Sequence, residues 1–444
     1  MSAAPRPLLG ARPAQSRAGL ALVVCWLAVL AATWTLRTAS GLVPQMLNLV
    51  LVYSGVAGLV VALVRSPRFP AERLTALVLV LGAVGWYFSK VLLAPEPAVF
   101  WQHVGNLLGG VLPGLVLGAL VGLAASDLVV GREPAAQSSA QLMWFDRILV
   151  LDGITVALLA IYLLANTLDD VLLVSTELLA GAETYQTIGD ALTVNLLSAY
   201  LLARVRRRVG YDPRRALGLL GLPLLCVATL GCAVLTGSNK LLLVAAGVLL
   251  AVALPSLGAA WRRRPGWTTA GTLSALALAL TLIAFVGGLY DVLALTRLLD
   301  YGQVDSILDT PSLASRSEIL AACGALQFSY APVLGEIAAE HLSCGPGNYV
   351  HSLLSVQSHL GGVGSLLLIA VLARGAWAVR SDDAYRPMWT IGGLVLLVGL
   401  LAAFFAWLPF WYLLGAATGI RAHPSSLRAG AQMSASPATL KRTP

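Results

Sequence analysis

The sequence predicts an all-α polytopic membrane protein with about 12 transmembrane helices and one large loop outside the cytoplasm. Three observations predict this class. The chain of 444 residues is 58% hydrophobic and only 11% charged, whereas a soluble domain carries about 25% charged residues. Runs of about 20 apolar residues, long enough to cross a bilayer as a helix, recur along the chain. The basic residues lie between these runs, mostly on alternate connections.

Taken in order, the apolar runs give twelve expected spans. They are 19–36, 43–64, 73–94, 99–125, 143–166, 187–204, 216–236, 239–259, 268–290, 347–373, 388–405 and 406–420. The first is interpreted as an uncleaved helix rather than a signal peptide, because no convincing small-residue cleavage site follows it. The last two come from one run that is too long for a single crossing. Within it, Pro409 and the flanking aromatic residues favour a tight hairpin at a membrane interface.

The distribution of basic residues predicts the orientation. Of the 29 Lys and Arg residues, all but five lie on one set of connections, which the positive-inside rule places in the cytoplasm with both termini. The other five are Arg37, Lys90, Lys240, Arg297 and Arg316. The net charge of +8 is therefore expected to serve topology and anionic lipid headgroups rather than nucleic acid.

This topology divides the chain into five parts. Residues 1–18 form a cytoplasmic N-terminal segment, 19–290 the first nine helices, 291–346 the large outer loop, 347–420 the last three helices, and 421–444 a disordered cytoplasmic tail rich in Ser, Pro and Ala. Among the five cysteines, Cys25, Cys226 and Cys232 fall in expected helices and are interpreted as small core residues. Cys323 and Cys344 lie in the outer loop, where a disulfide is an open alternative.

The stretch 345–368, GPGNYVHSLLSVQSHLGGVGSLLL, is the first candidate site, because polar groups near membrane depth usually mark function. His351 is the candidate general base, since a histidine titrates near neutral pH. The alternative is a hydrogen-bonded interfacial histidine. His359 is expected to be a packed histidine bonded to a neighbouring carbonyl, His341 a solvated loop residue, and His103 an interfacial one. The nearby glycines, from Gly361 to Gly364, are expected to allow close helix packing.

Two basic residues outside the cytoplasm are candidate anion ligands. Lys240 opens a helix after the break at TGSN, where free N–H groups favour phosphate; the alternative is a lysine that reaches to water. Arg316, in SLASRSEIL, can clamp an anion with its guanidinium fork or simply pair with Glu318. The sequence contains no HExxH, CxxC, GxSxG or P-loop motif, so no metal site or nucleotide cofactor is expected.

Several of these segments together resemble the bacterial O-antigen polymerase and O-antigen ligase superfamily. The segment CGPGNYVHSLLSVQSHLGGVGSLLL is similar to the family's GxGxxNxxxH[NS] pattern and the glycine pair that follows. His351 and Ser352 fall on its His-polar pair. SRSEIL resembles the loop arginine segment, with Arg316 in that place, and TGSNKLLLVAAGVLL resembles the turn before an apolar helix. Here Asn239 and Lys240 stand where the family has arginine. LPFWYLLGAATG is also similar to the last helix, so the resemblance spans about 230–420.

The resemblance implies a metal-independent inverting glycosyltransferase in the bacterial inner membrane, with no cofactor and an active site that faces the periplasm. The outer loop 291–346 would then be periplasmic. The implied partners are an undecaprenyl-pyrophosphate-linked glycan donor, a glycan or lipid-linked acceptor, membrane lipids and, as a further candidate, a chain-length regulator. Lys240 and Arg316, together with Arg297, would bind the pyrophosphate, and His351 would be catalytic. A polymerase, a ligase that acts on a lipid A-core acceptor, and a transporter or flippase of polysaccharide precursors remain three alternatives.

Overall fold

The computed structural model describes the helical core of the chain. The described residues are 71–130, 139–169, 185–208, 216–236, 238–263, 331–339, 352–402 and 405–420, with single positions at 318, 319, 321, 322, 329 and 342. Within these ranges the regular structure is entirely helical. The all-α prediction is confirmed for this part of the chain.

The described helices follow the apolar runs of the sequence. They are α3 (Ala71–Leu92), α4 (Pro97–Asn106), η1 (Leu107–Val111), α5 (Leu112–Val130), α6 (Ser139–Asp169), α7 (Tyr185–Arg208), α8 (Ala216–Thr236), α9 (Asn239–Arg263), α15 (Ser355–Ser381), η4 (Asp383–Tyr385), α16 (Pro387–Ala402) and α17 (Leu408–Gly419). The predicted spans from 73–94 to 239–259, together with 388–405 and 406–420, closely overlap described helical segments, whereas the span 347–373 overlaps α15 with a later start. The spans 19–36, 43–64 and 268–290 and most of the outer loop lie outside the described residues.

Three stretches of the described chain are long and apolar enough to cross a membrane. They are Thr75–Leu92, Pro97–Ser126 and Ser355–Ser381, while Gly221–Ala233 and Lys240–Ala253 are shorter apolar helices. The second stretch is one predicted span that the structure builds from α4, the π-helical turn η1 and α5. These lengths and compositions support a membrane protein, and a count of twelve crossings remains a prediction.

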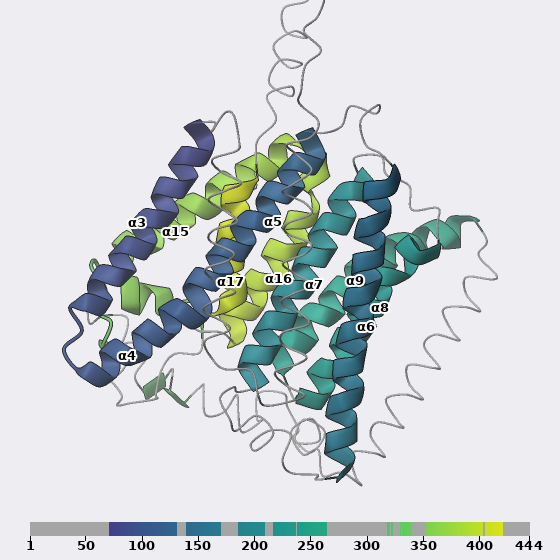
Figure 1. The fold of residues 1–444 in the computed structure, drawn as a ribbon. Helices are drawn as coiled ribbons and strands as arrows, with labels where there is room; N and C mark the ends of the chain where they lie inside the picture. Colours follow the sequence, from purple (N-terminus) through teal and green to yellow (C-terminus); the bar gives the residue numbers. More distant parts are fainter. Residues whose placement is uncertain are drawn as a thin grey trace, which may run out of the picture.

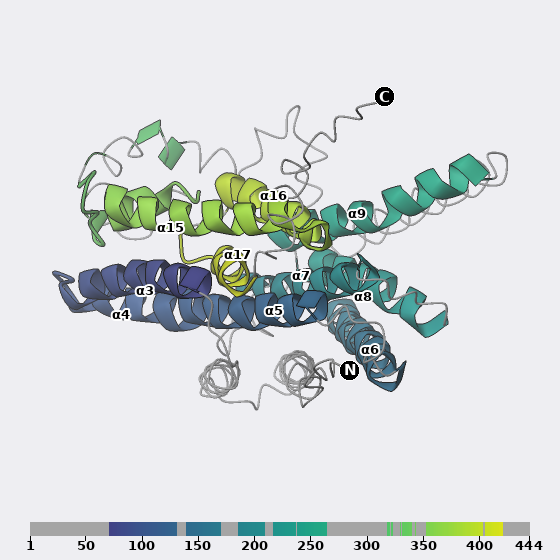
Figure 2. The ribbon, with the colours of Figure 1, turned by 90° about the horizontal axis from the view of Figure 1, so that it is seen from above.

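The short helix α17 forms the centre of the bundle. It packs along α5 and also contacts α15, α16, α7 and α3. In Figure 2 it lies between α15 and α16 on one side and α3 and α5 on the other. Helices α6 and α8 pack against each other at the far side of α7 (Figure 1). Nearly all of α17 is buried, and the sequence explains this position, because its twelve residues carry no charge.

Glycines allow α17 to approach α5 closely. Gly110, Gly114, Gly118 and Gly122 recur every fourth residue and form one face of η1 and α5. A Cβ added at Gly114 would lie 2.5 Å from the Leu408 carbonyl oxygen, and one at Gly118 would overlap the Tyr412 carbonyl oxygen. Small residues at this spacing let two membrane helices pack backbone against backbone.

The ends of α17 are held by its neighbours. Pro409 lies in its first turn and Trp407 directly precedes the helix. At the other end Arg374 of α15 donates to the carbonyl oxygens of Ala417 at 2.7 Å and Ile420 at 3.3 Å. The guanidinium therefore satisfies carbonyls that the end of a helix leaves unpaired.

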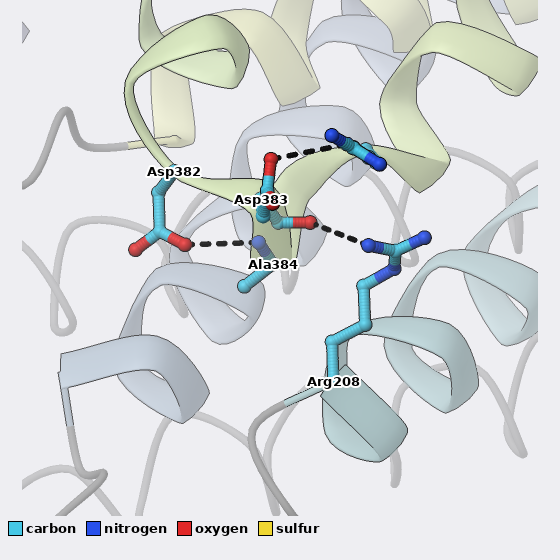
Figure 3. A network of polar contacts seen from close by, with 5 residues as sticks. Arg208, Asp382, Asp383 and Ala384 are labelled. Atoms are coloured by element: carbon cyan, nitrogen blue, oxygen red, sulfur yellow. Dashed lines mark hydrogen bonds and ion pairs between the residues drawn. The ribbon is translucent and has the colours of Figure 1, made fainter.

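Three arginines, Arg206, Arg208 and Arg386, lie at one end of the bundle, called here the arginine end. Arg206 Nη2 lies 2.9 Å from Asp146 Oδ2 in a buried ion pair between α7 and α6. Figure 3 shows Arg208 donating to the Asp383 carbonyl oxygen at 3.1 Å, beside the ion pair between Asp383 and Arg386. The Asp382 carboxylate in the same view accepts from the Ala384 N–H at 2.9 Å and caps η4. The described connection between α15 and α16, which the charge distribution predicts to be cytoplasmic, lies at this end.

Candidate functional site

Lys240 lies at the opposite end of the bundle from the arginine end, where α8 gives way to α9. The chain breaks its helix after Thr236 and begins α9 at Asn239. Ser238 bridges the two helices, since its N–H donates to the Ala233 carbonyl and its own carbonyl accepts from Leu242. The side chain of Lys240 is half-buried. It therefore holds a positive charge at a helix N-terminus, where the partial charge of the backbone is also positive.

A carboxylate lies within electrostatic range of this lysine. Asp190, in the first turns of α7, is attracted electrostatically to Lys240 and accepts a hydrogen bond of 2.7 Å from Trp407 Nε1. The sequence did not predict that Asp190 lies near Lys240 or binds Trp407. An acidic residue inside an apolar run was nevertheless a sign that Asp190 has a function. Lys240 thus has a protein counter-charge in this structure. An anionic ligand would share the lysine with Asp190.

The connection between α16 and α17 joins this lysine to the start of α15. Trp407 binds Asp190, and Phe405, two residues earlier, stacks on the His359 ring with centroids 4.4 Å apart. The Phe405 N–H also donates to Ser355 Oγ at 2.9 Å. Residues from α7, α9, α15 and the connection before α17 therefore meet in one polar and aromatic layer at this end of the bundle.

His103 corrects a prediction, because it is fully buried rather than interfacial. Its Nε2 lies 3.1 Å from the Ile337 carbonyl oxygen, which can only accept, so Nε2 carries the hydrogen. Its Nδ1 lies 2.9 Å from the Tyr87 hydroxyl, which also donates to the His103 carbonyl oxygen at 3.2 Å. The exposed aromatic neighbour Trp101 made the sequence read as interfacial, whereas His103 points from the same helix into the core.

His359 is a packed structural histidine, as the sequence suggested. Its Nδ1 donates to the Ser355 carbonyl oxygen at 2.8 Å, within its own helix. The side chain is buried, and its ring centroid lies 5.4 Å from that of His103. The packing of the buried His359 ring against His103 and Phe405 supports its interpretation as a structural residue.

Helix α15 begins later than the predicted span 347–373. Residues 352–354 form a turn, and the helix starts at Ser355. The backbone turns again at Gly361, whose φ is 65°. Such a φ favours glycine. The absence of a side chain at Gly361 also lets its backbone approach that of Gly335, which has a positive φ of 72°.

The structure describes one of the four predicted site residues. Lys240 is placed as given above, whereas His351, Arg316 and Arg297 lie outside the described residues. Convergence of Lys240 and Arg316 on one anion remains a prediction. Among the described residues no three His, Cys, Asp or Glu side chains gather as metal ligands would. Cys226 and Cys232 are buried free thiols, in agreement with their interpretation as core residues.

The chain matches no family model, no curated protein and no solved structure. Its function is therefore argued from the residues themselves.

Proposed function

We propose that this chain is a membrane-embedded, metal-independent inverting glycosyltransferase. It transfers oligosaccharide repeat units from undecaprenyl pyrophosphate to a growing cell-surface polysaccharide, at the periplasmic face of the bacterial inner membrane. The observation that supports the proposal is the position of Lys240. It is a half-buried cation at a helix N-terminus, at the end of the bundle opposite the arginine end, in a segment that resembles the polymerase and ligase superfamily.

The proposed reaction assigns a role to each predicted residue. The acceptor hydroxyl attacks the anomeric carbon of the donor sugar, and the bond from that carbon to the phosphate oxygen breaks with inversion. Lys240 and Arg316, with Arg297, bind the pyrophosphate and stabilise its charge as it leaves. His351 takes the proton of the acceptor hydroxyl. No metal is required in this scheme, because the basic side chains neutralise the leaving group.

Asp190 makes a sharp test of the role of Lys240 possible. Lys240→Met leaves Asp190 without its counter-charge, so lost activity could reflect misfolding alone. The double variant Asp190→Asn/Lys240→Met removes both charges, while the introduced amide would keep an oxygen for Trp407 Nε1. A contact between a cation and phosphate contributes about 1.5–3 kcal/mol. The double variant is therefore expected to transfer about 10- to 150-fold more slowly than Asp190→Asn.

The assay uses purified protein, lipid-linked repeat units and no ion gradient, and it measures the length of the glycan. Lys240→Arg is the charge-retaining control and His351→Ala the variant expected to lose about 10²- to 10⁴-fold in rate. If the double variant recovers the activity of Asp190→Asn, Lys240 only balances Asp190 and the proposed pyrophosphate contact is wrong. Absence of glycan growth with the unaltered protein would refute the polymerase proposal, and transfer to a lipid A-core acceptor alone would favour the ligase.

The transporter alternative rests on a different observation. Asp152 of α6 is buried and accepts a hydrogen bond of 2.9 Å from Asn195 of α7. A buried carboxylate between membrane helices is typical of ion-coupled carriers. Glycan growth without a gradient decides against this alternative, because a carrier forms no glycosidic bond.

A further inference from the structure

A short segment between the predicted arginine and histidine sites is bound to the helix bundle. Residues 331–339, called here the docked segment, lie against the start of α15. The backbone N–H groups of Gly362 and Val363 donate to the carbonyl oxygens of Pro332 and Val333 at 2.8 and 3.1 Å. The Glu336 N–H donates in return to the Ser358 carbonyl oxygen at 2.8 Å. Backbone therefore pairs with backbone on both sides of the break at Gly361.

Two glycines make this contact possible. Gly335 and Gly361 both have positive φ and lie against each other. A Cβ on Gly335 would lie 2.5 Å from the His359 carbonyl oxygen, and one on Gly361 would lie 2.5 Å from that of Val333. The close approach of Gly335 and Gly361 therefore fixes the position of the docked segment along α15.

Two residues of the N-terminal half complete the docking. Lys90, in the last turn of α3, donates from Nζ to the Gly335 carbonyl oxygen at 3.0 Å. His103 of α4 donates from Nε2 to the Ile337 carbonyl oxygen at 3.1 Å. The two contacts link positions 245 and 234 residues apart in the chain. Both donors come from helices that lie outside the stretch that resembles the transferase superfamily.

The placement of these donors has a physical reason. The carbonyl groups of Gly335 and Ile337 turn toward a bundle whose surface is mostly apolar, where an unpaired carbonyl is costly. Lys90 and His103 supply a hydrogen bond to each of them. Lys90 also lies 5.2 Å from the centroid of the Trp86 ring, which favours its charge in this half-buried position.

We propose that Lys90 and His103 are positioning residues of the transferase. They hold the docked segment against the start of α15. In the sequence, Arg316 lies 15 positions before Ala331, the first residue of the docked segment, and His351 directly precedes Ser352, so both predicted site residues adjoin the held parts of the chain. The inference rests on the proposed function for its catalytic consequence. The docking itself rests on the described contacts alone.

The docking is tested by thiol labelling. Ala339 is fully buried and Val333 is 64% exposed. Ala339→Cys therefore reports on the bound side of the segment and Val333→Cys on its exposed side. Both are made in a protein whose five native cysteines are replaced by alanine. A hydrogen bond to a charged donor contributes about 1.5–3 kcal/mol. Lys90→Met should therefore raise the labelling rate at Ala339→Cys about 10- to 150-fold and leave Val333→Cys unchanged.

A matched control lies at the arginine end. Arg208→Met also removes a cation that donates to a backbone carbonyl, and it should not change labelling at Ala339→Cys. His103→Phe keeps the ring and removes the bond to Ile337, so it serves as a second test where Lys90→Met fails to fold. Equal labelling rates in the unaltered protein and in these variants would overturn the docking role.

The catalytic part has its own measurement. Turnover per folded molecule should fall at least about tenfold in Lys90→Met, with the KM for the lipid-linked donor little changed, and should return in Lys90→Arg. Faster labelling with unchanged turnover would overturn the positioning role. An unaltered protein without transfer activity would refute the proposed function and its catalytic consequence, while the labelling comparison would still decide the docking.

Discussion

Gly118→Ala is a direct test of the contact between α5 and α17. The added Cβ would overlap the Tyr412 carbonyl oxygen and would also lie 2.7 Å from the Ala416 N atom. Both atoms belong to the backbone, so neither can rotate away as a flexible side chain could. The two helices must separate to admit the methyl group.

The expected magnitude follows from two opposing effects. Overpacking of a close contact costs about 1–3 kcal/mol, whereas alanine favours a helix by about 1 kcal/mol over glycine. Gly105→Ala provides the matched control, because no atom lies within 4 Å of a Cβ at this position in α4. The helix preference is common to both variants, so the difference between their free energies of unfolding isolates the cost of overpacking. We expect Gly118→Ala to be less stable than Gly105→Ala by about 1–3 kcal/mol.

Unfolding in detergent micelles, followed by tryptophan fluorescence against added denaturing detergent, measures this difference. Trp411 of α17 lies beside the contact and reports on it. Gly118→Leu should enlarge the effect, since a larger side chain meets the same backbone atoms. Equal stabilities of Gly118→Ala and Gly105→Ala would refute the close packing of α5 and α17.

Two further predictions concern the arginine end and the orientation of the chain. Asp146→Ala should cost about 3–5 kcal/mol in the same unfolding assay, because it removes the ion-pair partner of the buried Arg206. The double variant Asp146→Ala/Arg206→Met should recover most of this loss, and failure to recover would show that the loss does not come from the uncompensated charge of Arg206. In a protein without other cysteines, Ser306→Cys should react with an impermeant thiol reagent from outside intact spheroplasts. Reaction only after permeabilisation would reverse the predicted topology.

The helices could be predicted from the sequence because length and hydropathy alone determine them. The predicted span 216–236 coincides with α8, and Pro409 lies in the first turn of α17. Hydropathy did not reveal that α17 is central. A helix of twelve residues is about 18 Å long, well short of a bilayer core of about 30 Å. The central position of α17 follows from the glycine face of α5, which lies almost 300 residues earlier in the chain. Hydropathy cannot reveal this contact, because it depends on the small size of the glycines.

The candidate site was less accessible to sequence reasoning. A lysine after a helix break could be recognised at Lys240 from local sequence alone. Asp190 and Trp407 could not be assigned to it, because their contact joins positions 217 residues apart. The prediction that His103 is interfacial was wrong for the same reason. Its neighbour Trp101 suggested an interface, while its partner Ile337 belongs to a distant loop that only the folded chain brings near.

The order of synthesis gives the central helix a further meaning. Helix α17 emerges from the ribosome after every other described helix, yet α5, α15 and α16 close around it. Until it is made, the glycine face of α5 has no partner and the carbonyl-binding guanidinium of Arg374 has nothing to cap. Helix α8 contacts both α6 and α9 without α17, whereas α5 meets its close backbone partner only once α17 is present. The central contact of this bundle, between α5 and α17, therefore depends on the last described helix to be synthesised.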